Sequence, residues 1–308
     1  MYDAGKELLS GQGRLERAKK RELPEDTPAD EWPGGAATDE TPGMDLMHPD
    51  EIAASIRVRH IQTPLPRLLG FPRTEAVTNV RQALAERQFN SAPVLDNGQV
   101  SGYVLASDLQ DETDTIEPHI RPIAIGTVIT GDTPLAALMP CMVDVGFLYV
   151  VEGNKISGIV TPHDLNKQPG RTYFYLLVSA LELALAECIR GHFPDQEAAV
   201  LMLRPSRRRR MQDRFKEQRS RDTVADHVAA MDFVDLFSVI GETDELLQAF
   251  GAYTSDGWLR EVTKPIHGLR NDVMHTVRTF TTDTAQSLRQ LIHLDELVRQ
   301  LLVVLTTT

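Results

Sequence analysis

A short motif occurs twice in this sequence and restricts the first half of the chain to a repeated architecture. Residues 101–109 read SGYVLASDL and residues 157–165 read SGIVTPHDL, so Ser, Gly, Val, Asp and Leu coincide in register. The turns that precede the two copies, at residues 96–98 and 152–154, also correspond. A period of 56 residues exceeds the roughly 20–50 residues typical of solenoid units. We therefore expect two small modules that pack together.

The pattern within the first copy is that of a compact α/β unit. Residues 80–88 place apolar side chains at helical spacing. Residues 92–95 have the pattern of a short buried strand, and Asp96-Asn97-Gly98 has that of a tight hairpin turn. Residues 100–105 follow as a second strand, after which Ser107 can begin a helix. The predicted order is helix, strand, turn, strand and helix.

The end of the second copy, in which glycine and two apolar residues precede a Thr-x-x-Asp-Leu pattern, resembles the final motif of CBS domains, and the first copy differs from this pattern in having Leu105 in the threonine position. Two copies in tandem resemble the usual CBS pair, with repeat 1 at residues 55–113 and repeat 2 at residues 114–168. The resemblance implies that the pair binds an adenosine nucleotide, ATP, ADP or AMP, as a regulatory ligand.

The resemblance assigns three residues to the nucleotide, Thr161, Asp164 and Asp108. In nucleotide-binding CBS pairs, the threonine and aspartate of the motif contact the phosphate and the ribose. The first repeat has Leu105 in the threonine position, so its pocket is expected to be weaker unless Ser107 compensates. The alternative interpretation is that these side chains only cap the helices that follow them.

After Gly170 the sequence predicts an all-α bundle with short connections. Residues 172–192 are apolar and rich in alanine, with a helical period. Further helices are expected after Pro194, over residues 224–250, beyond Pro265 and Gly268, and over residues 284–305. The expected fold class is α+β and multidomain, with two α/β repeats followed by a helical bundle over residues 171–305.

The sharpest chemical signal is the segment HGLRNDVMH within that helical region. Pro265 and Gly268 predict that a helix starts at this point. Arg270 and Asn271 would then lie at the first turn, and His275 one turn further along. Unpaired N–H groups at a helix start favour phosphate, an arginine adds a bidentate phosphate ligand, and a histidine titrates near neutral pH. The segment therefore predicts a site for phosphoryl chemistry.

This segment resembles the Arg-x-x-x-x-His motif of HEPN domains, which are small helical bundles. Many HEPN domains are metal-independent ribonucleases that work as dimers. In such a reaction Arg270 would hold the developing charge, Asn271 would orient the phosphate or the histidine, and His275 would act as base or acid. The resemblance implies no metal and no catalytic cofactor. The alternative is a capping asparagine and a surface histidine in an inert bundle.

A run of basic residues lies within the predicted bundle. Residues 204–221 contain nine basic and two acidic residues. Four of the basic residues are consecutive: Arg207, Arg208, Arg209 and Arg210. One interpretation is a phosphate-binding surface for RNA, and the other is a solvated helix face. Phe215 is the single aromatic residue in the run, which argues against base stacking as the main mode of recognition.

Composition and charge limit the remaining classes. The net charge of -12 argues against a chain that coats nucleic acid with its whole surface. Residues 1–43 are expected to form a flexible acidic tail, because residues 22–50 hold nine acidic residues and five prolines but no lysine or arginine. No apolar run approaches the roughly 18 residues of a membrane span, and we find no secretory pattern. A cytoplasmic location without a membrane partner is expected.

Together these features predict an endoribonuclease of HEPN type that is regulated by nucleotide binding to the CBS pair. It would act on RNA as a homodimer. The pairing of a sensor with an RNA-cleaving domain suggests a stress response, a toxin or antiphage defence. The rival hypothesis is a non-catalytic nucleotide sensor whose helical bundle dimerises or binds RNA or another partner.

Overall fold

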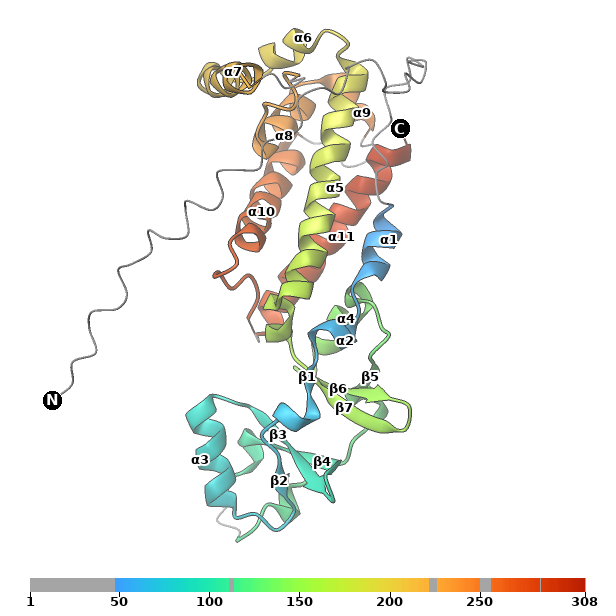
Figure 1. Cartoon of the computed structure of the whole chain (residues 1–308), viewed down its shortest axis with the longest axis vertical. Coiled ribbons are helices and arrows are strands. Elements are labelled where there is room, and N and C mark those ends of the chain that lie inside the picture. The colour runs from blue at the N-terminus through green and yellow to red at the C-terminus, as the bar shows by residue number, and fades with distance from the viewer. Residues whose placement is uncertain (1–47, 111–113, 222–225, 250–255, 283, 308) are drawn as a thin grey trace, which may run out of the picture. The chain divides into compact units, whose positions relative to one another are not determined.

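The computed structural model describes residues 48–110, 114–221, 226–249, 256–282 and 284–307. Within these residues two α/β modules precede a set of helices (Figure 1). The expected α+β organisation is therefore confirmed. The tail predicted for residues 1–43 lies outside the described residues.

The first module is built around a three-stranded sheet of order β2-β3-β4. It contains β2 (Phe71–Pro72), α3 (Val77–Arg87), β3 (Ser91–Asp96) and β4 (Gln99–Leu105). The hairpin between β3 and β4 turns at Asn97 and Gly98, whose φ angles are 49° and 76°. Asparagine and glycine tolerate positive φ better than other residues, which is why this pair gives a tight hairpin.

The second module repeats this arrangement around a four-stranded sheet of order β1-β7-β6-β5. Its elements are β5 (Val128–Thr130), α4 (Leu135–Met142), β6 (Leu148–Glu152) and β7 (Lys155–Val160), and β1 (Thr63–Pro64) adds the edge strand. The register of the first hairpin shifts between Val94 and Leu95, and that of the second between Val150 and Val151. These positions correspond in the repeat, so the likeness extends to backbone irregularities.

In each module, the central hairpin pairs with a segment that lies in the other repeat of the sequence. Thr63 pairs with β7 of the second module, and Arg121 bridges to Tyr103 of the first. A Cβ at Gly158 would lie 2.4 Å from the Thr63 carbonyl oxygen, and one at Gly102 would lie 2.8 Å from that of Arg121. The close approach of these segments explains the repeated glycine. The predicted boundaries, 55–113 and 114–168, do not anticipate this exchange.

The two modules differ in their hydrophobic cores. The first has a small core of its own, formed by Phe71, Val77, Val80, Leu84, Ala92, Val94, Val104, Leu109 and Ile116. The core of the second continues without interruption into the helices that follow it. Three aromatic rings join the modules, because Tyr103 lies 5.3 Å from Phe147 and 6.3 Å from Tyr149 between ring centroids.

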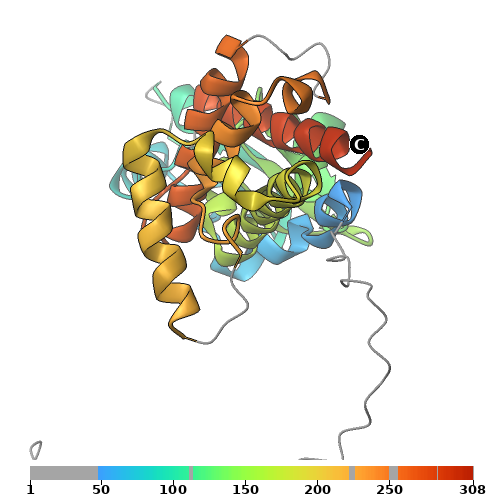
Figure 2. The same ribbon diagram turned by 90° about the horizontal axis from the view of Figure 1, so that it is seen from above.

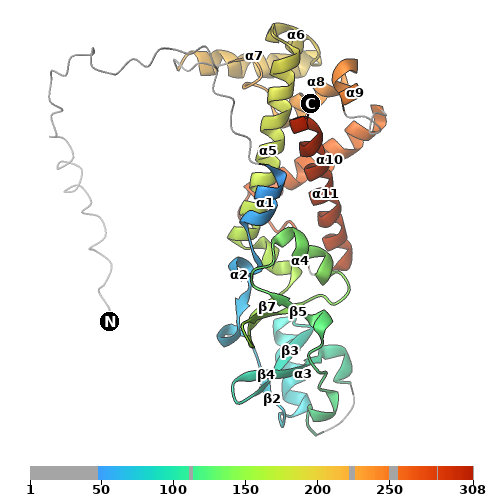
Figure 3. The same ribbon diagram turned by 90° about the vertical axis from the view of Figure 1, so that its right-hand side faces the viewer.

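The C-terminal half is helical, as predicted. Its elements are α5 (Gln168–His192), α6 (Gln196–Leu201), α7 (Pro205–Arg219), α8 (Phe233–Gly241), α9 (Asp244–Ala249), α10 (Asp256–Met274) and α11 (Ala285–Thr307). The long helix α5 contacts α8, α10 and α11. Two N-terminal helices, α1 (Pro49–Ser55) and α2 (Val58–Ile61), also contact α5. Figure 3 shows α1 beside α5, whereas α7 lies at the side of the bundle in Figure 2.

Two helix predictions in this half were wrong. The helix expected over residues 224–250 is divided into α8 and α9, with residues 222–225 outside the described part. Asp232 starts α8 through a capping box with Asp235, which explains why helix begins there. The helix expected beyond Pro265 and Gly268 instead begins at Asp256. Pro265 is exposed, so water can satisfy the carbonyl group that loses its donor.

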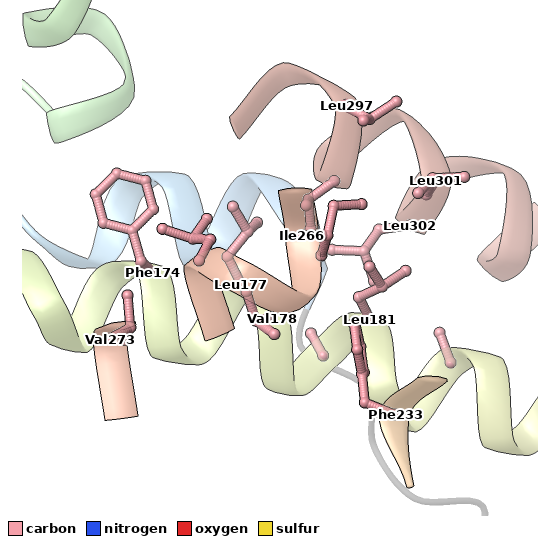
Figure 4. Packing of buried hydrophobic residues seen from close by; sticks show 14 of the residues in the cluster. Phe174, Leu177, Val178, Leu181, Phe233, Ile266, Val273, Leu297, Leu301 and Leu302 are labelled. Atoms are coloured by element: carbon pink, nitrogen blue, oxygen red, sulfur yellow. The ribbon is translucent and has the colours of Figure 1, made fainter. Parts of the chain in front are cut away.

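Helix α5 forms the centre of the bundle. In Figure 4 its residues Phe174, Leu177, Val178 and Leu181 lie among apolar side chains of α8, α10 and α11. Among the described residues it is also the one helix that is long and apolar enough to cross a membrane by length and composition. This helix contains scattered polar residues, which is why a search for uninterrupted apolar runs does not find it. More than half of the apolar window is buried within the protein.

Candidate functional site

The Arg270, Asn271 and His275 motif lies at the opposite end of a helix from the one expected. Helix α10 ends at Met274, so Asn271 lies in its last turn and Arg270 directly precedes that turn. His275 follows directly, and its backbone N–H donates to the Asn271 carbonyl at 3.1 Å. The C-terminal end of a helix carries partial negative charge and presents carbonyl groups rather than N–H donors. The predicted placement of this motif at a helix start is therefore wrong.

Arg270 is engaged with an acidic partner. Its Nε and Nη2 donate to the two carboxylate oxygens of Glu182 on α5, at 3.1 and 3.3 Å. The guanidinium group also lies 5.7 Å from the centroid of the Phe233 ring. About a third of the Arg270 side chain is exposed, and it lines a small pocket of about 90 Å³ with Tyr175 and Ser179. A phosphate can reach this arginine, but it must compete with Glu182.

Asn271 connects the motif to a second histidine. Its Nδ2 lies 3.1 Å from Nε2 of His267, one turn earlier on the same helix. The remaining nitrogen, His267 Nδ1, is buried and has no hydrogen-bond partner among the described residues. His267 is not among the site residues predicted from the sequence. The i, i+4 spacing of His267 and Asn271, which places both on one helix face, is the signal that could have found it.

His275 is exposed, but the backbone around it accepts hydrogen bonds from a buried arginine. Arg171 at the start of α5 is buried, and its Nη1 donates to the carbonyl oxygens of Asp272 at 2.9 Å and His275 at 3.4 Å. Its Nη2 donates to the Arg278 carbonyl, and the guanidinium group lies 5.1 Å from the centroid of the Phe280 ring. Arg171 thus supplies the positive charge that the C-terminal end of α10 requires.

Asn166 holds the other side of the same loop. Its Oδ1 accepts the backbone N–H of Phe280 at 2.9 Å, and its Nδ2 donates to the Thr281 carbonyl at 2.8 Å. Asn166 is the last residue of the 3₁₀ turn Pro162–Asn166, which also contains Asp164 of the predicted nucleotide site. We name Asn166 and Arg171 the junction clamp. The sequence carried no signal for it, because an Asn or Arg after the repeat motif is ordinary.

The second-repeat nucleotide residues lie together but already satisfy one another. Asp164 Oδ2 accepts from the Thr161 backbone N–H at 2.7 Å and from the Thr161 hydroxyl at 3.1 Å. Its Oδ1 accepts from the Thr63 hydroxyl at 3.2 Å and pairs with Lys167 Nζ at 2.7 Å. The carboxylate is nearly fully buried. Thr161 and Asp164 therefore form a capping box, as the alternative interpretation proposed.

The first-repeat residue Asp108 has a different partner. Arg121 donates to it through Nε at 2.6 Å and Nη2 at 3.0 Å, and the Ser107 hydroxyl donates to it at 3.2 Å. The hydrogen bonds from Arg121 hold the pKa of the Asp108 carboxyl below its usual value. Leu105 precedes the turn without a side-chain cap, as expected for a residue that replaces threonine. The two repeats thus use their aspartates in different contacts.

The four consecutive arginines divide into two pairs. Arg207 Nε donates to Asp235 at 2.5 Å, and Arg208 Nη2 donates to the carbonyl oxygens of Leu201 and Leu203 at 2.7 and 3.1 Å. These two side chains attach α7 to neighbouring elements. Arg209 and Arg210 are exposed, and within the described part of the chain we find no ion pair for either. Two of these four arginines therefore hold the structure together, and the other two are available to solvent and to partners.

Comparisons with known proteins find similarity to CBS domains for part of the chain. The family model of the CBS domain matches residues 121–169. A CBS domain-containing protein of unknown function from Bacillus anthracis is 15% identical, with a TM-score of 0.34, 38% of this chain covered and 94% of the other. The CBS-pair protein CBSX2 from Arabidopsis thaliana, solved also in complex with AMP, is 20% identical, with a TM-score of 0.32 and coverages of 36% and 92%.

A third solved structure, CbpB in complex with c-di-AMP, is 23% identical, with a TM-score of 0.32, 38% of this chain covered and 85% of the other. A comparison of the sequence with curated proteins gave no match. The family match agrees with the position of the second repeat, and the first repeat has the same hairpin and the same register shift. The chain therefore contains a CBS domain at residues 121–169, followed by a largely helical C-terminal region.

Proposed function

We propose that this protein is a metal-independent endoribonuclease whose helical bundle is controlled by an adenosine nucleotide bound to the CBS pair. The observation that carries the proposal is the junction clamp. Asn166 and Arg171 bond the end of the second repeat to the loop that contains His275. A change in the conformation of the 3₁₀ turn at Asp164 therefore has a direct route to the motif histidine.

The proposed chemistry uses the nucleophile that RNA carries, its 2′-hydroxyl. An exposed His275 is accessible to take or give the proton, and general acid–base catalysis of this kind contributes about 10²–10⁴-fold. Arg270 would exchange Glu182 for the phosphate, because a bidentate arginine binds either anion in the same geometry. One chain supplies one motif histidine, so a dimer would bring base and acid together.

The proposed ligand of the CBS pair is an adenosine nucleotide, the class bound by CBSX2 and by CbpB in their solved structures. In this chain the ribose hydroxyls would replace the Thr161 and Lys167 contacts of Asp164. Such a replacement opens the capping box, which is two residues before Asn166. The coupling between the ligand and the His275 loop can be no larger than the ligand's differential affinity for the two arrangements.

The deciding experiment is incubation of the purified chain with total RNA in EDTA. We expect cleavage that leaves cyclic phosphate ends, and a loss of about 10²–10⁴-fold in His275→Ala with an unchanged thermal midpoint. The matched control is His293→Ala, because His293 is another exposed histidine and lies on α11. Undiminished cleavage by the His275→Ala protein would show that the motif is not the active site.

The proposed RNA contact is tested through Arg209 and Arg210, since Arg207 and Arg208 have structural partners. The double variant Arg209→Ala, Arg210→Ala should weaken RNA binding and reduce the slope of log K against log salt by about 0.7 per lost contact on single strands. The folded stability should stay within about 0.5 kcal/mol of the wild type. An unchanged salt slope would show that Arg209 and Arg210 are only solvated and do not contact RNA.

A second function has an observation in its favour. The Glu182 carboxylate neutralises Arg270, and the motif lies at the negative end of α10. Both features oppose phosphate binding, so the bundle would then only dimerise or bind RNA or another partner while the CBS pair senses nucleotide. Glu182→Gln separates the two functions. Removal of the competing charge should raise cleavage by an active ribonuclease and should produce none in a non-catalytic sensor.

A further inference from the structure

A cavity of about 410 Å³ lies between α7, α8, α9 and α10, and no residue of the CBS repeats lines it. This volume is in the range of small-molecule sites, about 300–1,000 Å³. The buried part of its wall is apolar, because Leu203 and Phe237 line it and are each 2% exposed. The small pocket that contains Arg270 shares none of the lining residues. The cavity is therefore separate from the sites described above.

Two cationic side chains on the lining have no anionic partner. Arg204 precedes α7 and Lys264 lies on α10; both are exposed, and neither forms an ion pair within the residues that the structure describes. Arg207 also lines the cavity, but its Nε donates to Asp235 at 2.5 Å. A carboxylate on the same lining, Glu242, already interacts with another group of the protein. The charges of Arg204 and Lys264 are therefore available to an anion that enters the cavity.

A further donor on the lining, in His267, lacks an acceptor. The Asn271 amide nitrogen donates to His267 Nε2 at 3.1 Å, so the proton of the neutral ring is on Nδ1. This Nδ1 is buried and has no hydrogen-bond partner in the described part of the chain. Burial of an unpaired N–H group is unfavourable. A ligand that brings an acceptor into the cavity would give this group the partner that it lacks.

The remaining polar groups of the lining are already engaged. The Ser238 hydroxyl donates to the Val234 carbonyl of its own helix at 2.8 Å, and Thr263, like Glu242, already has a partner. A ligand with many hydroxyl groups would therefore leave donors unpaired, which is unfavourable. An ionised carboxylate only accepts hydrogen bonds, and a hydrocarbon body matches the apolar wall. The lining thus favours a ligand with a carboxylate head and an apolar body.

We propose that this cavity binds an apolar carboxylate of the fatty-acid type. Arg204 and Lys264 bind the carboxylate head, and the hydrocarbon body lies against Leu203 and Phe237. An apolar cavity of about 150 Å³ binds one benzene molecule, so in proportion a cavity of about 410 Å³ holds up to roughly 16 heavy atoms. A medium-length fatty acid such as decanoate is within this limit. The site depends neither on nucleotide binding by the CBS pair nor on cleavage by His275.

The test is calorimetry of the full chain with decanoate, and with decanol as the uncharged probe of the same chain length. The double variant Arg204→Ala, Lys264→Ala should weaken decanoate binding by at least about tenfold, because charge-assisted hydrogen bonds to the head are lost. Its affinity for decanol should stay nearly unchanged. The matched control is Arg209→Ala, Lys216→Ala, which removes the same charge from exposed positions of α7 that do not line the cavity. The control should bind decanoate as tightly as the wild type.

The length of the hydrocarbon body gives a second measurement on the wild type. In the series hexanoate, octanoate and decanoate, the affinity should rise by about fourfold for each added methylene group that the cavity buries. A third measurement fills the cavity. Ser238→Phe should abolish decanoate binding, and hydrogen exchange of α8 and α10 should no longer slow when decanoate is added. If this variant does not fold, the double variant still tests the site, because it changes two exposed side chains.

The outcomes separate a carboxylate site from general binding to apolar surface. Weaker decanoate binding in the double variant, with retained decanol binding, supports the proposal. Three results would overturn it: no binding of decanoate to the wild type, equal affinity of the wild type for decanoate and decanol, or unchanged decanoate affinity in the double variant. Neither probe is a nucleotide or RNA, so these results and those for the proposed ribonuclease can fail independently.

Discussion

The two CBS-like modules share a motif, a hairpin and a register shift, but their hydrophobic cores have different neighbours. The first encloses a small core of its own, and its Asp108 pairs with Arg121 near the surface. The second has a core continuous with the helical bundle, and its turn contacts the His275 loop through the junction clamp. A repeated sequence thus sets the local structure of both copies, whereas the surroundings decide what each copy contacts.

A matched pair of core truncations should give the largest difference between the two modules. Leu109 and Leu165 occupy equivalent positions in the repeat, and both are fully buried. Leu109→Ala and Leu165→Ala should each lower the free energy of unfolding by about 2–5 kcal/mol. Hydrogen exchange should rise only in the first module for Leu109→Ala but in α5 as well for Leu165→Ala. If both variants raised hydrogen exchange in the same elements, the two cores would not be separate.

The junction clamp gives the next largest effect. Arg171→Met should destabilise the protein by about 2–4 kcal/mol, because it leaves carbonyl groups at the end of α10 without donors. Arg289→Met is the control, since Arg289 is mostly exposed on α11, and it should change stability by at most about 0.5 kcal/mol. Denaturant unfolding measures both. A harmless Arg171→Met would mean that the clamp does not hold the loop.

The two aspartates should also differ in how much each contributes to nucleotide affinity. If the second repeat holds the ligand, Asp164→Ala should cost roughly 1.5–3 kcal/mol of nucleotide binding, on the order of tenfold or more in affinity. Asp108→Ala should cost less, because Leu105 replaces the threonine of its motif. Calorimetry with ATP, ADP and AMP decides between them. A larger loss in Asp108→Ala would assign the ligand to the first repeat.

The smallest expected effect is a pH dependence confined to the first module. The pKa of Asp108 is lowered, chiefly by its hydrogen bonds with Arg121. A lowered pKa in the folded state stabilises the protein above the unfolded value of 3.8, and this stabilisation is lost as the pH falls through the folded value. Asp108→Asn should therefore flatten the acid limb of the stability curve, as measured by thermal unfolding between pH 5 and about pH 2. An unchanged acid limb would show that the Asp108–Arg121 pair does not contribute to the stability of the folded protein.

Much of the fold could be predicted because its signals are local. The repeat, the Asn97-Gly98 hairpin and the long helix α5 each depend on short stretches of sequence. The exchange of Thr63 and Arg121 between modules could not be predicted, since it depends on pairing between distant segments. The start of α10 could not be predicted because Pro265 favours a helix boundary, whereas packing against α5 and α8 carries the helix through this residue.

The candidate site was only partly predictable for the same reason. The sequence identifies Arg270, Asn271 and His275 as chemically interesting, but it does not show that Glu182 on α5 pairs with Arg270. Nor does it show that Arg207 would be held by Asp235. These partners lie far away along the chain, and charge patterns alone do not identify which acidic residue a basic residue will meet.

The exchanged edge strand has a consequence for synthesis on the ribosome. Thr63 pairs with Ile159, so the second sheet is completed only after nearly a hundred further residues have been made. At about 5–20 residues per second, the segment at β1 waits for roughly 5–20 s before its partner is made. The first module can fold during this interval, but its neighbour cannot. A pause in translation just before β7 would prolong the exposure of this unpaired edge, where nascent chains are prone to associate with one another.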